Sequence, residues 1–149
     1  MKFDNFLKYA AGDGAILEAE NGDKWLFYAN VGMKIPNGKN VCGNVSVMPE
    51  AINDLIEYDD YVPCELKSAY VPNADSKPSE LIRRFERCGA DEDNNLFIDV
   101  PNKIFGFIER KDETFINEIV TDEYRYVALL VTDDYGDDRE FKMIYIEKD

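Results

Sequence analysis

The stretch "EYRYVALLVTDDYGDDREFKMIYIEK", residues 123–148, decides the fold. Its first part, "YRYVALLV", is nearly continuous in apolar residues, which is typical of a strand buried on both faces. Its last part, "EFKMIYIEK", has apolar side chains on both faces, with Lys142 as an interruption. Between them lies an acidic turn with Gly136, a residue type that tolerates positive φ. The stretch therefore predicts two long strands, 123–132 and 140–147, joined in a hairpin.

Apolar side chains at helical spacing predict helices upstream of this hairpin. The stretches are "KFDNFLKYAAGDG" (2–14), "PEAINDLIEY" (49–58) and "SELIRRFERCG" (79–89). Glycines end the first and third, and Pro49 suits the first turn of the second. A short helix should also follow Pro101, after a strand in "LFIDVPNKIFGFIER".

Further strands are predicted between these helices. "AILEAENGDKWLFYANV" (15–31) contains Asn21-Gly22, a pair that accepts the positive φ of a type I′ hairpin turn. "VCGNVSVM" (41–48) and "DDYVPCELKSAY" (59–70) also have strand character, and Pro63 places the second at a sheet edge. The stretch 71–79, "VPNADSKPS", predicts a long loop.

These elements predict an α+β fold with a mainly antiparallel sheet and three or four short helices. The length of 149 residues fits one compact domain, 1–149. One internal echo pairs "VMPEAINDLIE" (47–57) with "DVPNKIFGFIE" (99–109), each a strand, a proline and a helix. It leaves open two related α/β halves, 1–70 and 80–149, joined by the loop 71–79. The expected core residues are Phe6, Leu7, Trp25, Phe27, Ile52, Leu55, Leu81, Phe85, Phe105, Ile108, Leu129, Val131, Met143 and Tyr145.

Negative charge dominates the composition, with 31 acidic and 17 basic residues and a net charge of −14. Such a surface repels nucleic acids and anionic membranes, whose recognition requires clustered Lys and Arg. The charge serves either solubility alone or recognition of a basic protein partner. One local exception is Arg83, Arg84 and Arg87, expected on the outer face of the 79–89 helix and paired with neighbouring carboxylates.

The cysteines and the missing residue types restrict the chemistry. Cys42, Cys64 and Cys88 are odd in number and lack Cys-x-x-Cys spacing, so we expect small core residues in a reducing cytoplasm. The chain has no histidine, which removes the commonest general base and metal ligand. No phosphate-binding loop or nucleophile elbow is present. We expect a non-enzymatic protein without a cofactor or metal.

Three carboxylate clusters offer alternative sites. The turn 133–138 contains Tyr-Gly-Asp-Asp, which resembles the metal-binding turn of RNA-dependent polymerases, but those enzymes need a far longer chain. Neither this turn nor "ADEDNNLFID" (90–99) has the ligands of an EF-hand at the required positions. Asp122 with Glu140 and Lys142 resembles the magnesium-binding Asp…Glu-x-Lys set of restriction-endonuclease-like nucleases, and a carboxylate-metal nuclease is the least favoured function.

A second short resemblance involves "ANVGMKIPNGKNVCG", residues 29–43. It resembles the Ala-Asn-Leu-Gly opening of ArdA-type antirestriction proteins, which are acidic DNA mimics of mobile elements. The similarity covers 15 of the 149 residues, and no residue role follows from it. Like the negative charge, this resemblance favours an acidic inhibitor as the function.

We therefore expect an inhibitor, from a phage or mobile element, that mimics nucleic-acid charge and blocks a basic restriction or CRISPR effector. An immunity protein for a basic toxin, or a phage structural or assembly accessory, is the alternative. Residues 50–60 hold five acids and no base. The expected partner-binding residues are Glu50, Asp54, Glu57, Asp59, Asp60, Asp133, Asp134, Asp137 and Asp138.

Overall fold

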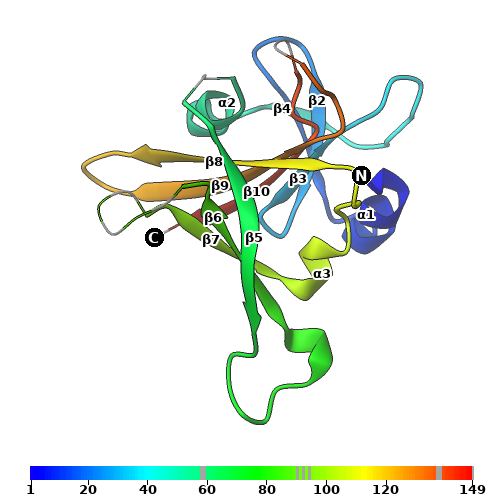
Figure 1. Cartoon of the computed structure of the whole chain (residues 1–149). Coiled ribbons are helices and arrows are strands. Elements are labelled where there is room, and N and C mark those ends of the chain that lie inside the picture. The colour runs from blue at the N-terminus through cyan, green and yellow to red at the C-terminus, as the bar shows by residue number, and fades with distance from the viewer. Residues whose placement is uncertain (58–59, 90, 92, 94, 137–138, 149) are drawn as a thin grey trace.

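The computed structural model describes residues 1–57, 60–89, 91, 93, 95–136 and 139–148. Strands dominate these residues, and the helices are short (Figure 1). The helices are α1 (Phe3–Ala10), α2 (Glu50–Glu57), the 3-10 helix η1 (Pro78–Glu80) and α3 (Asn102–Phe105). The strands are β1 (Ala15–Glu18), β2 (Lys24–Tyr28), β3 (Val31–Lys34), β4 (Val45–Val47), β5 (Val62–Tyr70), β6 (Ile82–Arg87), β7 (Phe97–Pro101), β8 (Glu113–Val120), β9 (Arg125–Thr132) and β10 (Met143–Lys148). The predicted α+β class is confirmed.

The strands form one sheet in the order β4-β1-β2-β3-β10-β9-β8-β5-β6-β7. Neighbours pair antiparallel, except that β4 runs parallel to β1. The predicted 123–148 hairpin lies at the centre, where β9 pairs with β10 from Val131↔Met143 to Tyr126↔Lys148. All residues from Val127 to Thr132 are buried, as the apolar run predicts. The two echo segments lead into α2 and α3 from the opposite edges, β4 and β7.

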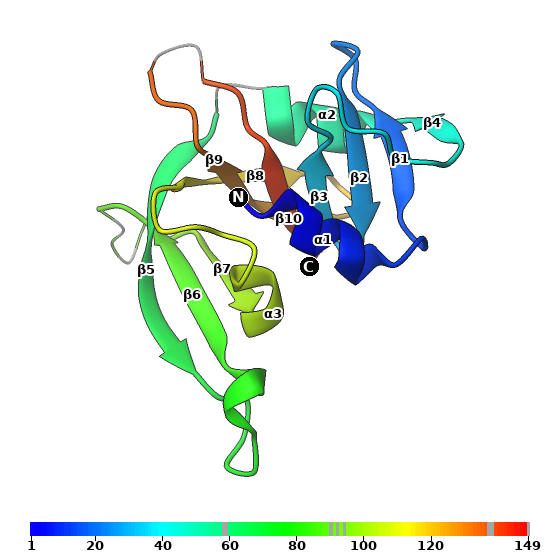
Figure 2. The same ribbon diagram turned by 90° about the vertical axis from the view of Figure 1, so that its right-hand side faces the viewer.

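The sheet bends sharply at β5, so that its last three strands turn over one face of the rest. Only two residues of β5, Val62 and Pro63, pair with β8. Beyond them β5 crosses β8 at a steep angle, and β6 and β7 follow it (Figures 1 and 2). The larger core fills the space between these layers, closed by α1 and α3. Its fully buried side chains include Phe6, Ile98, Ile116, Leu129 and Met143.

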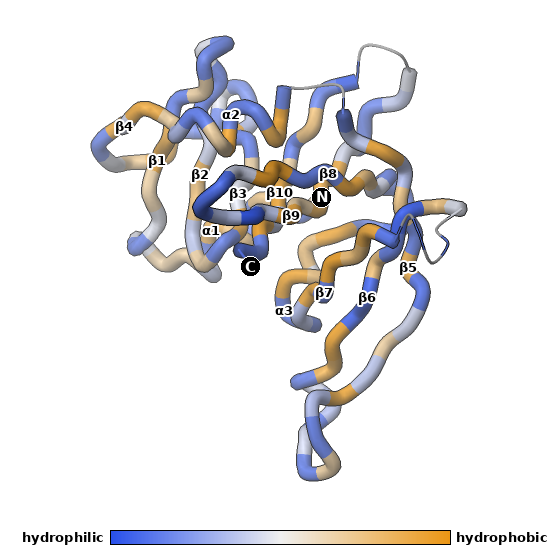
Figure 3. Tube along the Cα trace, turned by 90° about the vertical axis from the view of Figure 1, so that its left-hand side faces the viewer, coloured by the Kyte–Doolittle hydropathy of each residue, from blue (hydrophilic) through white to orange (hydrophobic). Residues whose placement is uncertain are grey.

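A smaller core covers the opposite face of the sheet, under α2. It holds Trp25, Phe115, Leu130 and Ile144 from four strands and Leu55 from the helix. Hydrophobic segments lie in the central strands and in β7, whereas β6 and most of the loops are polar (Figure 3). Because side chains alternate between faces along a strand, the central hairpin supplies both cores. The candidate functional site lies over the smaller one.

The predicted helix at 79–89 is wrong, because residues 82–87 form β6 between β5 and β7. Phe85 is buried, whereas Leu81 and Ile82 are half-buried and Cys88 is exposed. Their spacing fits a helix, but the paired strands satisfy the backbone hydrogen bonds of this segment on both sides. Tertiary pairing therefore overrides the apolar spacing.

Arg84 of β6 consequently lies on the opposite face of the strand from Arg83 and Arg87. Arg84 pairs with Asp99 through Nε and Nη2, at 2.9 and 3.0 Å, and stacks on Phe97. Arg83 lies 4.1 Å from the ring centre of Phe105. The hydrogen bonds from Arg84 hold the pKa of the Asp99 carboxyl below its usual range. Pairing with a carboxylate is thus confirmed for Arg84.

Other local predictions need correction. Cys64 is buried, and burial raises the pKa of its thiol to about 12, but Cys42 and Cys88 are exposed. Pro63 lies inside the sheet order, although β5 is paired with β8 at only two residues. Of the expected core, Leu7, Phe27, Ile52, Leu81, Phe105 and Ile108 are partly buried and the other eight are buried.

The type I′ turn occurs at a different hairpin from the predicted one. At Asn21-Gly22 only Gly22 has positive φ, and its N–H donates to the Ala19 carbonyl, 2.9 Å away. This is a three-residue loop, in which a type I turn is followed by a glycine. Positive φ at two successive residues, 52° and 67°, occurs instead at Ala29 and Asn30 between β2 and β3.

Candidate functional site: an acidic face on α2

Helix α2 is held on the smaller core by its apolar side. Leu55 is fully buried, and Ile52 and Ile56 pack around it. The helix begins at Glu50, directly after Pro49, whose carbonyl accepts from the N–H groups of Ile52 and Asn53 at 3.1 Å each. Burying a leucine contributes about 1.5–3 kcal/mol, so this contact fixes which side of the helix faces outward.

Two buried asparagines fix the position of α2 along the sheet. Asn53 Oδ1 accepts from the Glu20 N–H at 3.0 Å, and its Nδ2 donates to the Met48 carbonyl at 3.2 Å. Asn117 of β8 donates from Nδ2 to the Leu55 carbonyl, also at 3.2 Å. The first contact ties the helix to the β1–β2 turn, and the second ties it to β8. These hydrogen bonds therefore fix which side of α2 faces outward.

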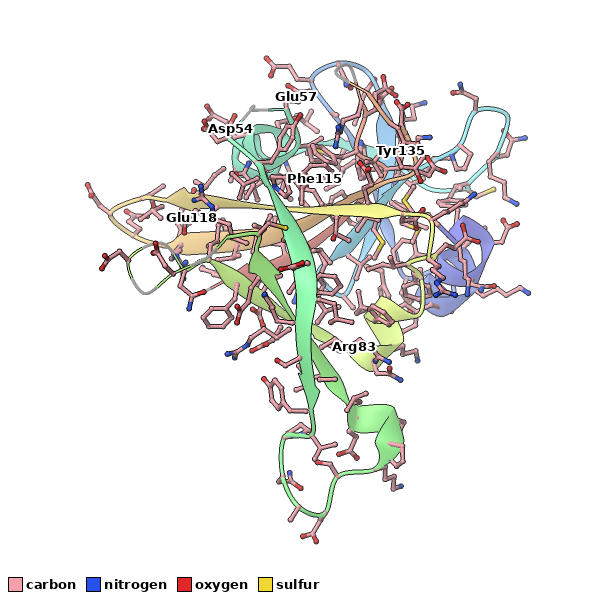
Figure 4. The ribbon with its side chains drawn as sticks, in the orientation of Figure 1. Asp54, Glu57, Arg83, Phe115, Glu118 and Tyr135 are labelled. Carbon is pink, nitrogen blue, oxygen red and sulfur yellow. The ribbon has the colours of Figure 1, made fainter. Side chains whose placement is uncertain are left out.

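That outer side carries carboxylates. Glu50 and Glu57 are exposed and Asp54 is half-buried, and Figure 4 shows Asp54 and Glu57 on the outer side of the helix. None of the three forms an ion pair or a side-chain hydrogen bond with any residue in the described part of the chain. Residues 40–66 contain six acids and no base, so no cation is available nearby in sequence.

The structure adds a residue to this surface that the sequence analysis missed. A hollow of about 630 Å³ lies beside the start of α2, and Glu18, Glu20, Glu50 and Asp54 are among its lining residues. Glu20 is exposed in the β1–β2 turn and reaches this place because Asn53 holds its backbone. The acid next to Asn21-Gly22 was a visible signal, but its position beside α2 depends on tertiary contacts. We call Glu20, Glu50, Asp54 and Glu57 the acidic α2 face.

The charges of α2 act against the stability of the helix. Glu50 and Asp54 are four residues apart and Asp54 and Glu57 three, so their Cβ atoms lie about 5–6 Å apart and their like charges repel. Glu57 also lies in the last turn, where the helix dipole disfavours an anion, and that turn has no basic residue. Only Glu50, in the first turn, complements the dipole.

The described aspartates of the β9–β10 turn form contacts within the protein. Lys142 Nζ lies 2.5 Å from Asp133 Oδ1. This hydrogen bond lowers the pKa of the Asp133 carboxyl below its usual value. Asp134 is half-buried, and its Oδ2 accepts from the Glu140 N–H at 3.3 Å. The two described aspartates of this turn are therefore engaged within the protein.

A second cation extends this network. Lys34 of β3 lies 2.9 Å from Glu140 Oε2 and 3.2 Å from Asp23 Oδ2. Burial alone would lower the pKa of Lys34, but its hydrogen bonds to Glu140 and Asp23 outweigh it and raise the pKa above the usual value. At the tip of the turn, the Tyr135 hydroxyl donates to the Lys111 carbonyl, and Gly136 has a φ of 123°.

The structure brings the two predicted acidic segments close to each other. Tyr61, one residue after the exposed Asp60, packs edge-on against Phe141 with ring centres 4.8 Å apart. The carboxylates on α2 and those beside Phe141 therefore lie on neighbouring surfaces. Asp59, Asp137 and Asp138 lie outside the described residues.

The nuclease-like set is not assembled. Glu140 pairs with Lys34 and Lys142 with Asp133. Asp122 lies in the β8–β9 turn, at the other end of β9 from Glu140. Eight strand residues, at roughly 3.3 Å each, separate these two ends. Among the described residues no group of three Cys, Asp or Glu side chains is placed to hold a metal ion.

Comparison with known proteins gives no relative: no family model matches the chain, and no curated protein or solved structure matches it significantly. In the described part of the chain, no helix has both the length and the apolar character needed to cross a bilayer.

Proposed function

We propose that this protein is a non-enzymatic inhibitor that uses the acidic α2 face to bind a basic protein. The target class is a nucleic-acid-binding bacterial defence protein, such as a restriction or CRISPR effector, and the source is a phage or mobile element. The observation that carries the proposal is the set of carboxylates on α2 without an ion pair, held in place by Asn53 and Asn117, beside a turn in which Asp133 and Glu140 are paired with lysines.

The electrostatics support this choice of partner. Carboxylates about 5–6 Å apart along a helix present a row of negative charges to a surface built to receive phosphates. Such complementarity steers association and falls as salt screens the charges, over about 10 Å at 0.1 M. Paired acids contribute little to this field, so the acidic α2 face is the favoured contact and the β9–β10 turn is secondary.

The test is capture of a partner from lysates of bacteria that express restriction or CRISPR effectors, at low and high salt. The wild-type protein is compared with the variant Glu50→Gln/Asp54→Asn/Glu57→Gln. The matched control, Asp13→Asn/Asp75→Asn/Glu80→Gln, removes the same charge at exposed positions outside α2. Both variants change the net charge from −14 to −11.

We expect the wild type and the control to retain the same basic partner at low salt, and the α2 variant to lose it. A parallel phage-plating assay should show that expression of the wild type relieves restriction. Equal capture by the α2 variant and the control, or capture that is unchanged by salt, would contradict the proposal. Self-association on size exclusion without any captured partner would favour the structural alternative.

A further inference from the structure

An apolar groove runs along α2 on the face of the sheet that the helix leaves uncovered. It has a volume of about 400 Å³. Its lining includes Phe27, Tyr28, Ile52, Leu55, Tyr126 and Ile146. It exists because α2 has only eight residues, about 12 Å at 1.5 Å per residue, and it cannot cover the ends of β2, β9 and β10.

The lining has the composition of a recognition surface. Three of its residues are aromatic, a class enriched in the centres of protein interfaces. Ala29, which also lines the groove, has a φ of 52°. An alanine in this region is strained, and glycine would be the favoured residue. A methyl group is thus present at the rim despite a conformational cost.

The groove and the acidic α2 face share one helix. Pro49, Ala51, Ile52 and Leu55 line the groove, and Glu50 and Asp54 lie between them in sequence. Glu50 and Asp54 themselves line the separate hollow beside the start of α2, but Asp54 is three residues from Ala51 and is therefore its neighbour on the helix surface. A segment lying in the groove thus has one carboxylate without an ion pair, that of Asp54, beside it. At the far end, Lys148 Nζ lies 5.9 Å from the rings of Tyr124 and Tyr126. Lys148 thus places a cation beside Tyr126, one of the lining residues.

We propose that this groove binds an amphipathic basic segment of the partner protein. The apolar side chains of the segment enter the groove, and its Lys and Arg side chains reach past Ala51 to pair with Asp54. The Asp54 carboxylate orients the segment, with its basic residues toward α2 and away from Lys148. The inference rests on the proposed function and adds the partner's chemistry, since charge mimicry alone requires no apolar contact.

The probe for the test is a random 16-residue peptide library displayed on phage and selected on the wild-type protein. Enriched peptides are synthesised and titrated against three variants by fluorescence anisotropy. Ala51→Phe fills the groove without changing charge, and Ala51→Gln makes its rim polar. Ala69→Phe adds the same ring on exposed β5 and is the control.

We expect enriched peptides to combine Lys or Arg with large apolar residues at helical spacing. Ala51→Phe should weaken their binding about tenfold, or about 1.4 kcal/mol, and leave the salt dependence unchanged. The α2 charge variant should weaken binding and flatten its salt dependence. Ala69→Phe should bind as the wild type does, and the same order of affinities is expected for the captured partner.

The proposal is overturned if no peptide is enriched, if the enriched peptides are basic without apolar residues, or if both Ala51 variants bind as the wild type does. It is also overturned if Ala51→Phe abolishes a homodimer, which would assign the groove to a second copy of the chain. Capture that depends on the α2 carboxylates but not on Ala51 would remove the groove and leave the proposed function standing. Capture that depends on neither would remove both.

Discussion

Helix α2 and the β9–β10 turn lie on neighbouring surfaces, and both carry closely spaced carboxylates. In the turn, Asp133 and Glu140 are paired with lysines, whereas the carboxylates of α2 form no ion pair with a described residue. At the turn, Lys142 and Lys34 lie within 3 Å of Asp133 and Glu140. On α2, no described cation is within ion-pair distance of any carboxylate. The difference arises from position in the sheet, because β3 brings Lys34 beside the turn. Counting acids along a sequence therefore does not locate the negative surface.

Truncation of Leu55 should have the largest effect on the free energy of unfolding, because the packing of this side chain holds the acidic α2 face in place. Leu55→Ala removes a fully buried side chain and should lower the free energy of unfolding by about 2–5 kcal/mol. Urea denaturation measures the loss. Leu66→Ala, at a side chain 46% exposed, should stay within about 0.5 kcal/mol of the wild type. Equal losses in the two variants would mean that α2 is not packed as described.

The Asn53 side chain should have a smaller effect. Asn53→Ala removes the acceptor of the Glu20 N–H and the donor to Met48, and should cost about 1 kcal/mol in urea denaturation. Hydrogen exchange of the Glu20 backbone amide should also be faster in this variant. Asn5→Ala, at an exposed position of α1, makes the same chemical change and gains the same helix propensity. It removes no side-chain hydrogen bond to a described residue. A loss in Asn5→Ala as large as that in Asn53→Ala would contradict the assignment.

The Lys142–Asp133 pair should have a pH-dependent effect. The pKa of Asp133 is lowered in the folded protein, so the pair contributes stability above the unfolded pKa and loses it as the pH falls through the folded value. Lys142→Met should cost about 0.2–1 kcal/mol at pH 7, as for an exposed pair, and almost nothing at low pH. Urea denaturation at both pH values measures this.

The control for that pair is Lys24→Met. Lys24 is exposed and forms no ion pair with a described residue, so its removal should leave the pH dependence of stability as in the wild type. A steeper pH dependence in Lys142→Met than in Lys24→Met would show that the pair does not stabilise the turn.

Neutralising α2 should have the smallest effect on stability, and of opposite sign. Asp54→Asn/Glu57→Gln relieves like-charge repulsion and an unfavourable dipole contact, and should raise the free energy of unfolding by about 0.3–1 kcal/mol. Thermal unfolding at low salt measures the gain, which should shrink at high salt. A loss of stability would mean that these carboxylates have stabilising partners.

Several elements could be predicted from local pattern, and others could not. The central hairpin, α1, the β1–β2 hairpin and the orientation of α2 follow from periodicity and turn residues. β6 could not be identified, because Leu81, Phe85 and Cys88 have helical spacing while the segment pairs as a strand. β8 has no counterpart among the predicted elements. Asn117 occupies one of its buried positions and interrupts the apolar pattern, since its partner is the distant Leu55 carbonyl.

The sequence by itself determined the α+β class, the central strands and the excess of negative charge, since these depend on composition and on spacing along the chain. Only the tertiary structure decided which carboxylates remain unpaired, that Glu20 joins those of α2, and that an apolar groove lies beside them. The physical reason is that ion pairs and cavities form between residues distant in sequence. Their spacing is set by how the strands pair and where a short helix lies on the sheet.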